Sequence, residues 1–300
     1  MSNLNVVVAL ISRDNDYQAE QAASVAEMAS RLGIRIDVIY ADNDAVNQTQ
    51  QLVKIIQSNK KPSAILVEPV GTGMPQVARA AVAAKIGWGI INNEPDYLAE
   101  LRGSGVPVFS ISTDQFEVGR IQGDQITALV RQGNILYIEG PASTMPAQQR
   151  TKGMMTTKPG AVTLKSLKGD WTERSAQRAV HSWLSLASSR QLHIQAVICQ
   201  NDAMAMGARK AMGDLTEADR EKWEQLPFTG VDGVPKTGQE WVKQGFLQAT
   251  IITTPVAGSA LEILAKAVHG GTMPPERILL PAKSFPSIAE LQKSRGRVKG

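Results

Sequence analysis

The sequence contains one cysteine, Cys199, and three histidines, His181, His193 and His269. A single cysteine cannot form an internal disulfide, and the apolar run around Cys199 predicts a small buried hydrophobic side chain rather than a nucleophile. The histidines stand on or beside helix-like segments, and no Cys/His spacing is typical of a zinc site. We therefore expect no bound metal.

Long apolar runs and nucleotide-binding motifs are also lacking. No window approaches the roughly 18 to 20 consecutive apolar residues of a membrane span. The segment after the first strand-like run, residues 12–16, is Ser-Arg-Asp-Asn-Asp, where a dinucleotide-binding protein has Gly-x-Gly-x-x-Gly. The turn at residues 71–73 is not followed by Lys and Ser or Thr, so it is not a P-loop. These absences predict a protein without a cofactor and without catalytic residues.

The formal charge of +4 and the isoelectric point near 9.1 are mildly basic. Lys and Arg are scattered along the chain until the tail at residues 293–299. A nucleic-acid surface needs clustered Arg and Lys with aromatic residues between them. We expect no nucleic-acid partner, and we interpret the tail as a solvated, frayed end.

The first five residues lead directly into a strand-like run, with no basic leader, apolar segment or cleavage site between them. Two locations stay open on this basis. The chain acts in the cytoplasm if the sequence is complete as written, or outside it if a leader has been removed.

Apolar strand-like runs alternate with helix-like segments in the first part of the chain. The predicted strands are Val6 to Ile11, Ile34 to Tyr40, Ala64 to Val67 and Gly89 to Ile91. The predicted helices are Tyr17 to Arg31, Ala45 to Ser58 and Met74 to Ala84. An irregular stretch is expected from Ile91 through Pro107. Near-continuous apolar strands joined through helices are typical of a parallel sheet that is covered on both faces.

The same alternation restarts after residue 115. The predicted helices are Phe116 to Val130, Pro146 to Met155 and Glu173 to Ser189. The predicted strands are Ile135 to Ile138, Val162 to Leu167, Ala196 to Cys199, Phe228 to Val231 and Ala249 to Ile252. Two successive α/β halves of similar size predict two domains, and a crevice between domains is a preferred site for a small ligand. The junctions near residues 112–114 and 253–255 are short and resemble hinges more than flexible tethers.

Polar and aromatic residues follow nearly every predicted strand. They are Asn15 and Tyr17, Glu68, Asn92 and Asn93, Arg150, Trp171, Asn201 and Asp202, Asp232, and Thr253. Amides and carboxylates engage vicinal hydroxyls with two atoms at once, and Arg supplies a planar fork of donors. Trp and Tyr offer an apolar face to the C–H side of a sugar ring. Ligands of open α/β sheets bind outside the carboxyl ends of the strands, so this set is typical of carbohydrate binding.

Each of these residues also has a purely structural interpretation. Asp14, Asn15 or Asp16 caps a helix equally well, and Asp232 with Gly233 is a good turn dipeptide. Trp171 alone is more often a packing residue. The recurrence of polar residues at successive strand ends favours binding. Within the pair after the seventh predicted strand, we expect Asn201 to contact ligand and Asp202 to cap the following helix.

Several motifs together resemble those of the ribose-type periplasmic sugar-binding proteins. They are Gln200-Asn201-Asp202-Ala-Met204-Ala-Met206-Gly207-Ala208, Thr229-Gly230-Val231-Asp232-Gly233, Gln248-Ala-Thr250-Ile251, Ser112-Thr113-Asp114, Gly119-Arg120-Ile121-Gln-Gly123, and residues 140–153 with Arg150. The resemblance covers nearly the whole chain. The same fold forms the effector-sensing part of LacI-type repressors.

The resemblance implies a periplasmic binding protein of type I, with two Rossmann-like domains that are joined by three hinge strands and close on a sugar. The implied domains are residues 1–112 with 254–281, and residues 113–253 with 282–300. It places ligand contacts at Asn15, Tyr17, Asn92, Arg150, Trp171, Asn201, Asp232 and Thr253, and we add Glu68 for its position after a strand. It also implies a monomer that delivers a sugar, polyol or modified sugar to the permease of an ABC importer.

The sequence departs from the ribose-type pattern at several of these positions. Asn92-Asn93 replaces an Asp-Arg pair, Gln18 replaces the second aromatic residue of the first loop, and Glu68 adds a carboxylate. Val231 and Thr253 replace an aromatic residue and a Gln. We expect the clamp to be retained and the ligand to be altered, and a positively charged group facing Glu68 and Asp232 is one form of that alteration.

Two other classes stay open. A cytoplasmic sugar-sensing module of the LacI-type fold agrees with the missing leader, although the five residues before Val6 cannot form a helix-turn-helix. An enzyme such as a sugar hydrolase is the third class, and turnover of a bound glycoside would establish it. Carboxylates in the predicted site fit binding as well as catalysis.

Overall fold

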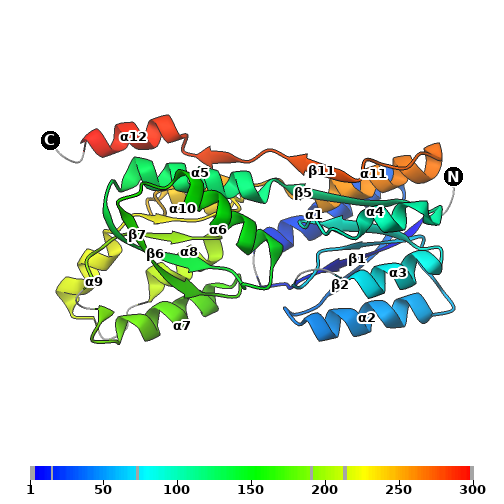
Figure 1. The fold of residues 1–300 in the computed structure, drawn as a ribbon, viewed down its shortest axis with the longest axis horizontal. Helices are drawn as coiled ribbons and strands as arrows, with labels where there is room; N and C mark the ends of the chain where they lie inside the picture. The colour runs from blue at the N-terminus through cyan, green and yellow to red at the C-terminus, as the bar shows by residue number, and fades with distance from the viewer. Residues whose placement is uncertain (1–3, 15, 72–73, 190–191, 212–214, 298–300) are drawn as a thin grey trace. The chain divides into compact units, whose positions relative to one another are not determined.

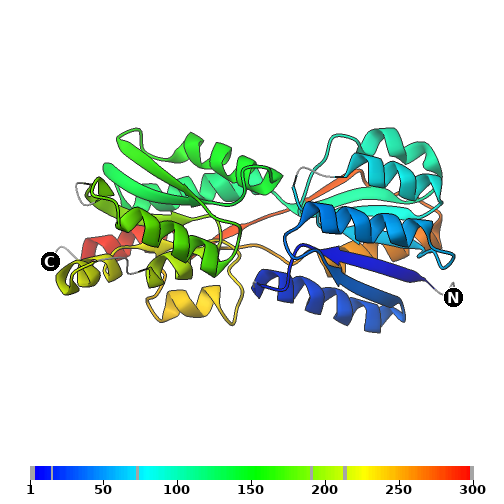
Figure 2. The same cartoon turned by 90° about the horizontal axis from the view of Figure 1, so that it is seen from below.

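The computed structural model describes residues 4–14, 16–71, 74–189, 192–211 and 215–297. Asn15, one of the predicted ligand contacts, lies outside the described residues. Contacts within the chain define an N-terminal unit, Met1–Thr113 with Pro255–Leu280, and a C-terminal unit, Asp114–Thr254 with Pro281–Gly300. The chain passes between these units three times (Figure 2). Each limit lies one residue from the domain limit predicted from the sequence.

The N-terminal unit is built on a six-stranded parallel sheet with the strand order β11-β5-β4-β3-β1-β2 (Figure 1). Its strands are β1 (Asn5–Leu10), β2 (Arg35–Tyr40), β3 (Ala64–Val67), β4 (Gly87–Ile91), β5 (Val108–Thr113) and β11 (Arg277–Leu280). Its helices are α1 (Asp16–Leu32), α2 (Ala45–Gln57), α3 (Pro75–Ala83), α4 (Leu98–Leu101) and α11 (Ala257–Gly270), with a 3-10 turn, η1 (Arg102–Ser104).

The apolar run of β1 explains why helices cover both faces of this sheet. Successive side chains of a strand point to opposite faces. Val6 and Val8 pack in one core cluster with Val25 of α1 and Leu261 of α11. Val7 and Ala9 pack in a second cluster, which contains residues of α2 and α3. The strand is buried on both sides, as expected for a parallel sheet between two helical layers.

The C-terminal unit has a four-stranded parallel sheet with the order β7-β6-β8-β9 and a separate antiparallel pair, β10 with β12. Its strands are β6 (Gly133–Glu139), β7 (Val162–Lys168), β8 (Ile194–Cys199), β9 (Phe228–Thr229), β10 (Thr250–Ile252) and β12 (Lys283–Phe285). Its helices are α5 (Gln115–Leu129), α6 (Met145–Thr157), α7 (Glu173–Leu184), α8 (Asp202–Lys210), α9 (Glu217–Glu224), α10 (Gly238–Lys243) and α12 (Ile288–Arg297). The predicted fold class, parallel α/β sheets in two units, is confirmed.

Strand β5 was not predicted from the sequence; it follows directly after the predicted irregular stretch, which ends at Pro107. The run Val-Phe-Ser-Ile-Ser-Thr pairs with β4 on one side and β11 on the other. All six of its residues are buried, including Ser110 and Ser112. The strand was missed because polar residues interrupt its apolar pattern and because glycines and a proline precede it.

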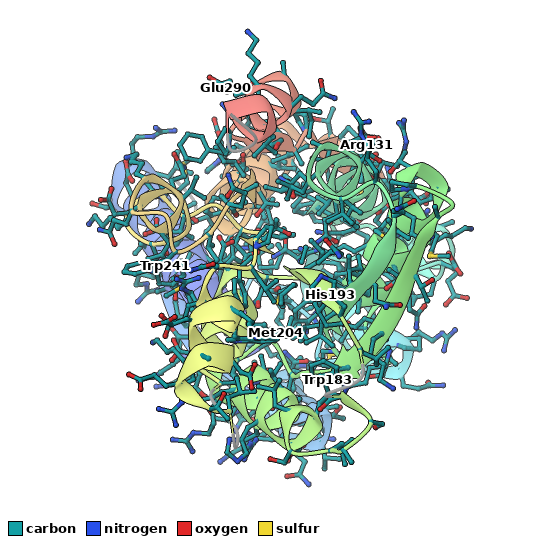
Figure 3. All side chains as sticks on the ribbon, turned by 90° about the vertical axis from the view of Figure 1, so that its left-hand side faces the viewer. Arg131, Trp183, His193, Met204, Trp241 and Glu290 are labelled. Carbon is teal, nitrogen blue, oxygen red and sulfur yellow. The ribbon has the colours of Figure 1, made fainter. Side chains whose placement is uncertain are left out.

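The C-terminal tail corrects one prediction. Helix α12 reaches Arg297, whereas a frayed end was expected from residue 293. Ser287 and Glu290 form a reciprocal cap, in which Glu290 Oε2 accepts from the Ser287 amide at 2.9 Å and Ser287 Oγ accepts from the Glu290 amide at 3.4 Å. Leu291 is 1 % exposed and packs with Ala128 and Ala249. Glu290 is labelled on this helix in Figure 3.

Candidate functional site

Three predicted site residues form one hydrogen-bonded group in the N-terminal unit. Strands β1, β3 and β4 are neighbours in the sheet, so the segments after them meet at one edge. Tyr17 Oη donates to Asn92 Oδ1 at 3.1 Å, and Asn92 Nδ2 donates to Glu68 Oε1 at 3.0 Å. All three side chains are buried, with exposed fractions of 4–9 %. We call Tyr17, Glu68 and Asn92 the N-terminal polar group.

This group is extended by Gln18 and by two glutamines that were not predicted from the sequence, Gln21 and Gln48. Gln18 Nε2 donates to Glu68 Oε2 at 3.0 Å, and Gln21 Nε2 donates to Tyr17 Oη at 3.4 Å. Gln48 Nε2 donates to the Glu68 carbonyl at 2.8 Å. Helical spacing could have predicted the burial of Gln21. This residue lies four positions from both Tyr17 and Val25 and shares their buried face of α1. A buried polar side chain on such a face needs partners, and here it finds them.

The backbone of Asn92 adopts a left-handed conformation with φ of 55°. Among residues with a side chain, asparagine tolerates this region best, and such residues gather at functional sites. The Asn92 amide is fixed because it donates to the Ile111 carbonyl at 2.9 Å. The turn after β4 thereby presents the Asn92 side chain to Tyr17 and Glu68.

In the C-terminal unit, Arg150 lies on α6 and is buried. Its Nε donates to Gln115 Oε1 at 2.8 Å, and its Nη1 donates to the Gln200 carbonyl. Close packing of α5 and α6 places it there, because a Cβ on Gly119 would lie 2.1 Å from the Arg150 carbonyl oxygen. The glycine on α5 therefore allows the two helix backbones to approach each other closely.

Trp171 lies beside this guanidinium, with Arg150 Cζ 5.5 Å from the centroid of the indole ring. Such a distance is typical of a cation–π contact. Trp171 has φ of 71°, and its carbonyl accepts a hydrogen bond from Asn201 Nδ2 at 2.9 Å. A bulky residue at positive φ is strained, so the surrounding contacts must hold it in place.

Asn201 caps helix α8, which corrects the prediction that Asp202 is the cap. Asn201 has extended backbone angles and its Oδ1 accepts from the Met204 amide at 2.9 Å. Asp202 is the first helical residue. Its carboxylate instead accepts from the Gly233 amide at 2.8 Å and from Thr250 Oγ1 at 2.6 Å. Asp202 therefore joins the loop after β9 to strand β10.

Asp232 and Thr253 lie next to each other after β9 and β10. The Asp232 amide donates to the Ile251 carbonyl at 3.0 Å, and the Thr253 amide donates to the Asp232 carbonyl at 3.1 Å. Asp232 has φ of 114° and is 8 % exposed, and Thr253 is 5 % exposed. The segment joins the rest of the group because the Asp202 amide donates to the Val231 carbonyl at 2.7 Å. We call Arg150, Trp171, Asn201, Asp232 and Thr253 the C-terminal polar group.

A cavity of about 460 Å³ in the C-terminal unit contains none of these residues. It is lined mainly by apolar side chains of α7 and α9 and of the segments beside them, including Trp183, Leu192, Trp223 and Leu226. Figure 3 labels Trp183 and His193, which both line it. Its lining also includes the polar residues Ser189, His193, Asp219, Lys222 and Gln225, and it is separate from the predicted site residues at the strand ends.

Cys199, the last residue of β8, lies outside both polar groups. Cys199 is fully buried, and burial, with a smaller effect of the Asp202 charge, raises the pKa of its thiol well above the usual value. Within the described residues, no group of three or more His, Cys, Asp or Glu is arranged to hold a metal ion. Over the same part of the chain, no helix has the length and apolar character that a membrane span requires.

Two units with parallel sheets and three chain crossings agree with the architecture expected of a two-domain periplasmic binding protein. A family model described as periplasmic binding protein domain matches residues 6–272. The chain belongs to this family, and the resemblance to its ribose-type members is confirmed.

Relatives of known function are similar over most of the chain. The D-allose-binding periplasmic protein of Escherichia coli is 25 % identical over 278 residues, which cover 89 % of this chain and 86 % of the relative. The ribose import binding protein RbsB of Salmonella typhimurium is 23 % identical and covers 90 % and 86 %. A solved Mycobacterium smegmatis protein in complex with β-D-fucofuranose has a TM-score of 0.81 at 22 % identity, over 97 % of this chain and 93 % of that one. This last similarity concerns the fold.

Proposed function

We propose that this protein is the solute-binding receptor of an ABC importer and binds one neutral sugar or sugar-like polyol between its two units by hinge closure. The observation that carries the proposal is the pair of polar groups, one at the strand ends of each unit. Each group combines an amide and a carboxylate with one aromatic side chain. Ligand-binding crevices of open α/β sheets lie at these strand ends.

The composition of the two groups fits a polyhydroxyl ligand. Amide and carboxylate side chains bind hydroxyls as donors and acceptors, and the Trp171 ring gives the C–H face of a sugar an apolar surface. A hydroxyl left without a partner in a closed site costs about 1 to 3 kcal/mol, so such a site discriminates between sugars by their stereochemistry. The relatives named for D-allose and ribose support this ligand class.

The remaining parts of the proposal follow from the family. The protein acts outside the cytoplasm as a monomer, delivers its ligand to a membrane permease, and performs no reaction of its own. The three hinge segments lie near residues 113, 254 and 280, where the chain crosses between the units. Asn15 is proposed as a ligand contact because of its place in the sequence after β1.

A thermal-shift screen over pentoses, hexoses and polyols tests the proposal. A ligand at 100 times its dissociation constant stabilises the folded protein by about 2.7 kcal/mol, and this raises the melting temperature measurably. The ligand that gives the largest shift is then titrated by calorimetry against the wild type and Trp171→Ala. The absence of any shift across the panel contradicts the proposed ligand class. Release of a hydrolysed product from a bound glycoside contradicts the absence of chemistry.

A further inference from the structure

The Glu68 carboxylate accepts hydrogen bonds from two side-chain amides that lie on different parts of the chain. Its Oε1 accepts from Asn92 Nδ2 and its Oε2 accepts from Gln18 Nε2, both at 3.0 Å. Carboxylate oxygens only accept, so both amides must turn their N–H₂ ends towards Glu68. The orientation of each amide, and hence the place of its carbonyl oxygen, is therefore set by this one carboxylate.

A series of hydrogen bonds links Glu68, through Asn92, to a backbone N–H donor at the opposite end of the series. The Ala257 amide donates to Gln21 Oε1 at 2.8 Å, so Gln21 must turn its Nε2 to Tyr17 Oη. Tyr17 then donates its own hydrogen to Asn92 Oδ1 at 3.1 Å. A backbone N–H cannot accept and a carboxylate cannot donate, so every bond between these two ends runs in one direction.

The backbone of Glu68 is also held in place. Its amide donates to the Ala9 carbonyl at 2.8 Å, and its carbonyl accepts from Gln48 Nε2 at 2.8 Å. Gln48 is fixed in turn because its Oε1 accepts from the Val70 amide at 2.8 Å. The carboxylate is thus presented from a rigid turn, which makes it suitable for orienting neighbours.

We propose that Glu68 is a positioning residue that sets the donor and acceptor directions of Gln18, Asn92 and Tyr17, and so determines which hydroxyl stereochemistry the N-terminal polar group accepts. The inference rests on the proposed function and deepens it. In this inference, the Glu68 carboxylate binds side chains of the protein itself and does not pair with a positively charged ligand.

Replacing Glu68 by glutamine tests the direction of the bonds with almost no change in volume. The new side chain has one acceptor and one donor, so its N–H₂ meets the N–H₂ of either Gln18 or Asn92. One amide must rotate to restore a hydrogen bond. If Asn92 rotates, Tyr17 no longer donates to it, and the hydrogen-bonding groups offered to a sugar change.

The experiment compares the wild type with Glu68→Gln and with a matched control, Glu100→Gln. Glu100 lies in the same unit and pairs with Arg79 at 2.6 Å on the surface, outside the N-terminal polar group. In ¹⁵N-labelled ligand-free protein, the side-chain amide resonances of Gln18 and Asn92 are recorded. Affinities for D-allose, D-ribose, D-galactose and D-galactosamine are then measured by calorimetry.

We expect Glu68→Gln to move both amide resonances and to change the ratio of affinities between two neutral sugars by at least about tenfold, while Glu100→Gln changes neither. A uniform loss for every sugar with an unchanged ratio overturns the inference, since that is the result of a merely structural role. Unmoved amide resonances overturn it, and so does a loss confined to D-galactosamine. If the wild type binds none of the four probes, the proposed ligand class fails, while the amide resonances still decide the role of Glu68.

Discussion

Trp171 lies so close to Gly140 that a Cβ built on the glycine would come within 2.3 Å of two carbons of the indole ring. Glycine at this position leaves room for the ring at the end of β6. The ring is further held by the Asn201 bond to its carbonyl and by the adjacent Arg150 guanidinium. The aromatic surface proposed for the sugar is therefore held by the protein's own contacts, which lowers the cost of ordering on binding.

This contact predicts the effect of Gly140→Ala. The added methyl group must displace the ring of Trp171, because the nearest atoms around it all belong to that side chain. We expect sugar affinity to fall at least about tenfold, since a misplaced ring loses its contact with the ligand. Calorimetry with the best ligand from the screen measures the loss. Gly160→Ala is the control, because no atom lies within 4 Å of the built Cβ there. An unchanged affinity in Gly140→Ala contradicts the role of Trp171.

Asn201→Ala removes two contacts at once, the cap of α8 and the bond to the Trp171 carbonyl. Loss of an N-cap costs about 0.5 to 2 kcal/mol of folding free energy. We expect a stability loss in that range by denaturant unfolding, together with weaker ligand binding. Asn201→Asp keeps the capping oxygen but cannot donate to Trp171, so it should restore most of the stability and none of the affinity. Recovery of both in the aspartate variant contradicts this division of roles.

Cys199 should resist modification in the native protein. Burial raises the pKa of its thiol, so the reactive thiolate is scarce at neutral pH and reagent has no access to it. We expect the thiol to react with a disulfide reagent only as fast as the protein unfolds, and at once in denaturant. Fast labelling of the folded protein at pH 7 would show that strand β8 is more accessible than the structure indicates.

The cap of α12 predicts a pH-dependent stability. The hydrogen bonds from Ser287 to Glu290 lower the pKa of this carboxyl in the folded protein below its usual value of 4.5. A group whose pKa is lower in the folded state stabilises the protein above its unfolded pKa and loses this effect as the pH falls through the folded value. We expect the difference in melting temperature between the wild type and Glu290→Gln to be full at pH 7 and to shrink below pH 4.5. A difference that is constant down to pH 3 rules out this cap as its cause.

The sequence was sufficient for the parallel strands whose residues are apolar throughout. The run of β1 and that of β3 need no tertiary context, because only a strand between two helical layers buries every side chain of such a run. Strand β5 was missed because its pattern contains the polar residues Ser110 and Ser112. These serines are buried because β5 pairs with β4 and β11, and β11 is distant in the sequence. Helix α12 was missed for a related reason, because its stability depends on the packing of Leu291 against residues distant in sequence.

In the predicted site, too, local sequence identified some residues, whereas contacts between distant residues could not be predicted. Residue type and position after a strand identified Tyr17, Glu68 and Asn92, and the structure brings them together. The partners Gln21 and Gln48 were not found, because nothing in a helical sequence reveals which buried amide reaches a strand end. The cap was assigned to Asp202 instead of Asn201 because adjacent polar residues both suit a cap, and the backbone angles decide between them.

The most direct test of the central claim measures one ligand against one variant from each unit. The affinity of the best sugar from the screen is determined by calorimetry for the wild type, Asn92→Ala and Trp171→Ala, with folding checked by circular dichroism. If both polar groups bind the same molecule, each variant loses at least about tenfold in affinity for that sugar while staying folded. Full affinity in either folded variant would contradict a single ligand held by both units.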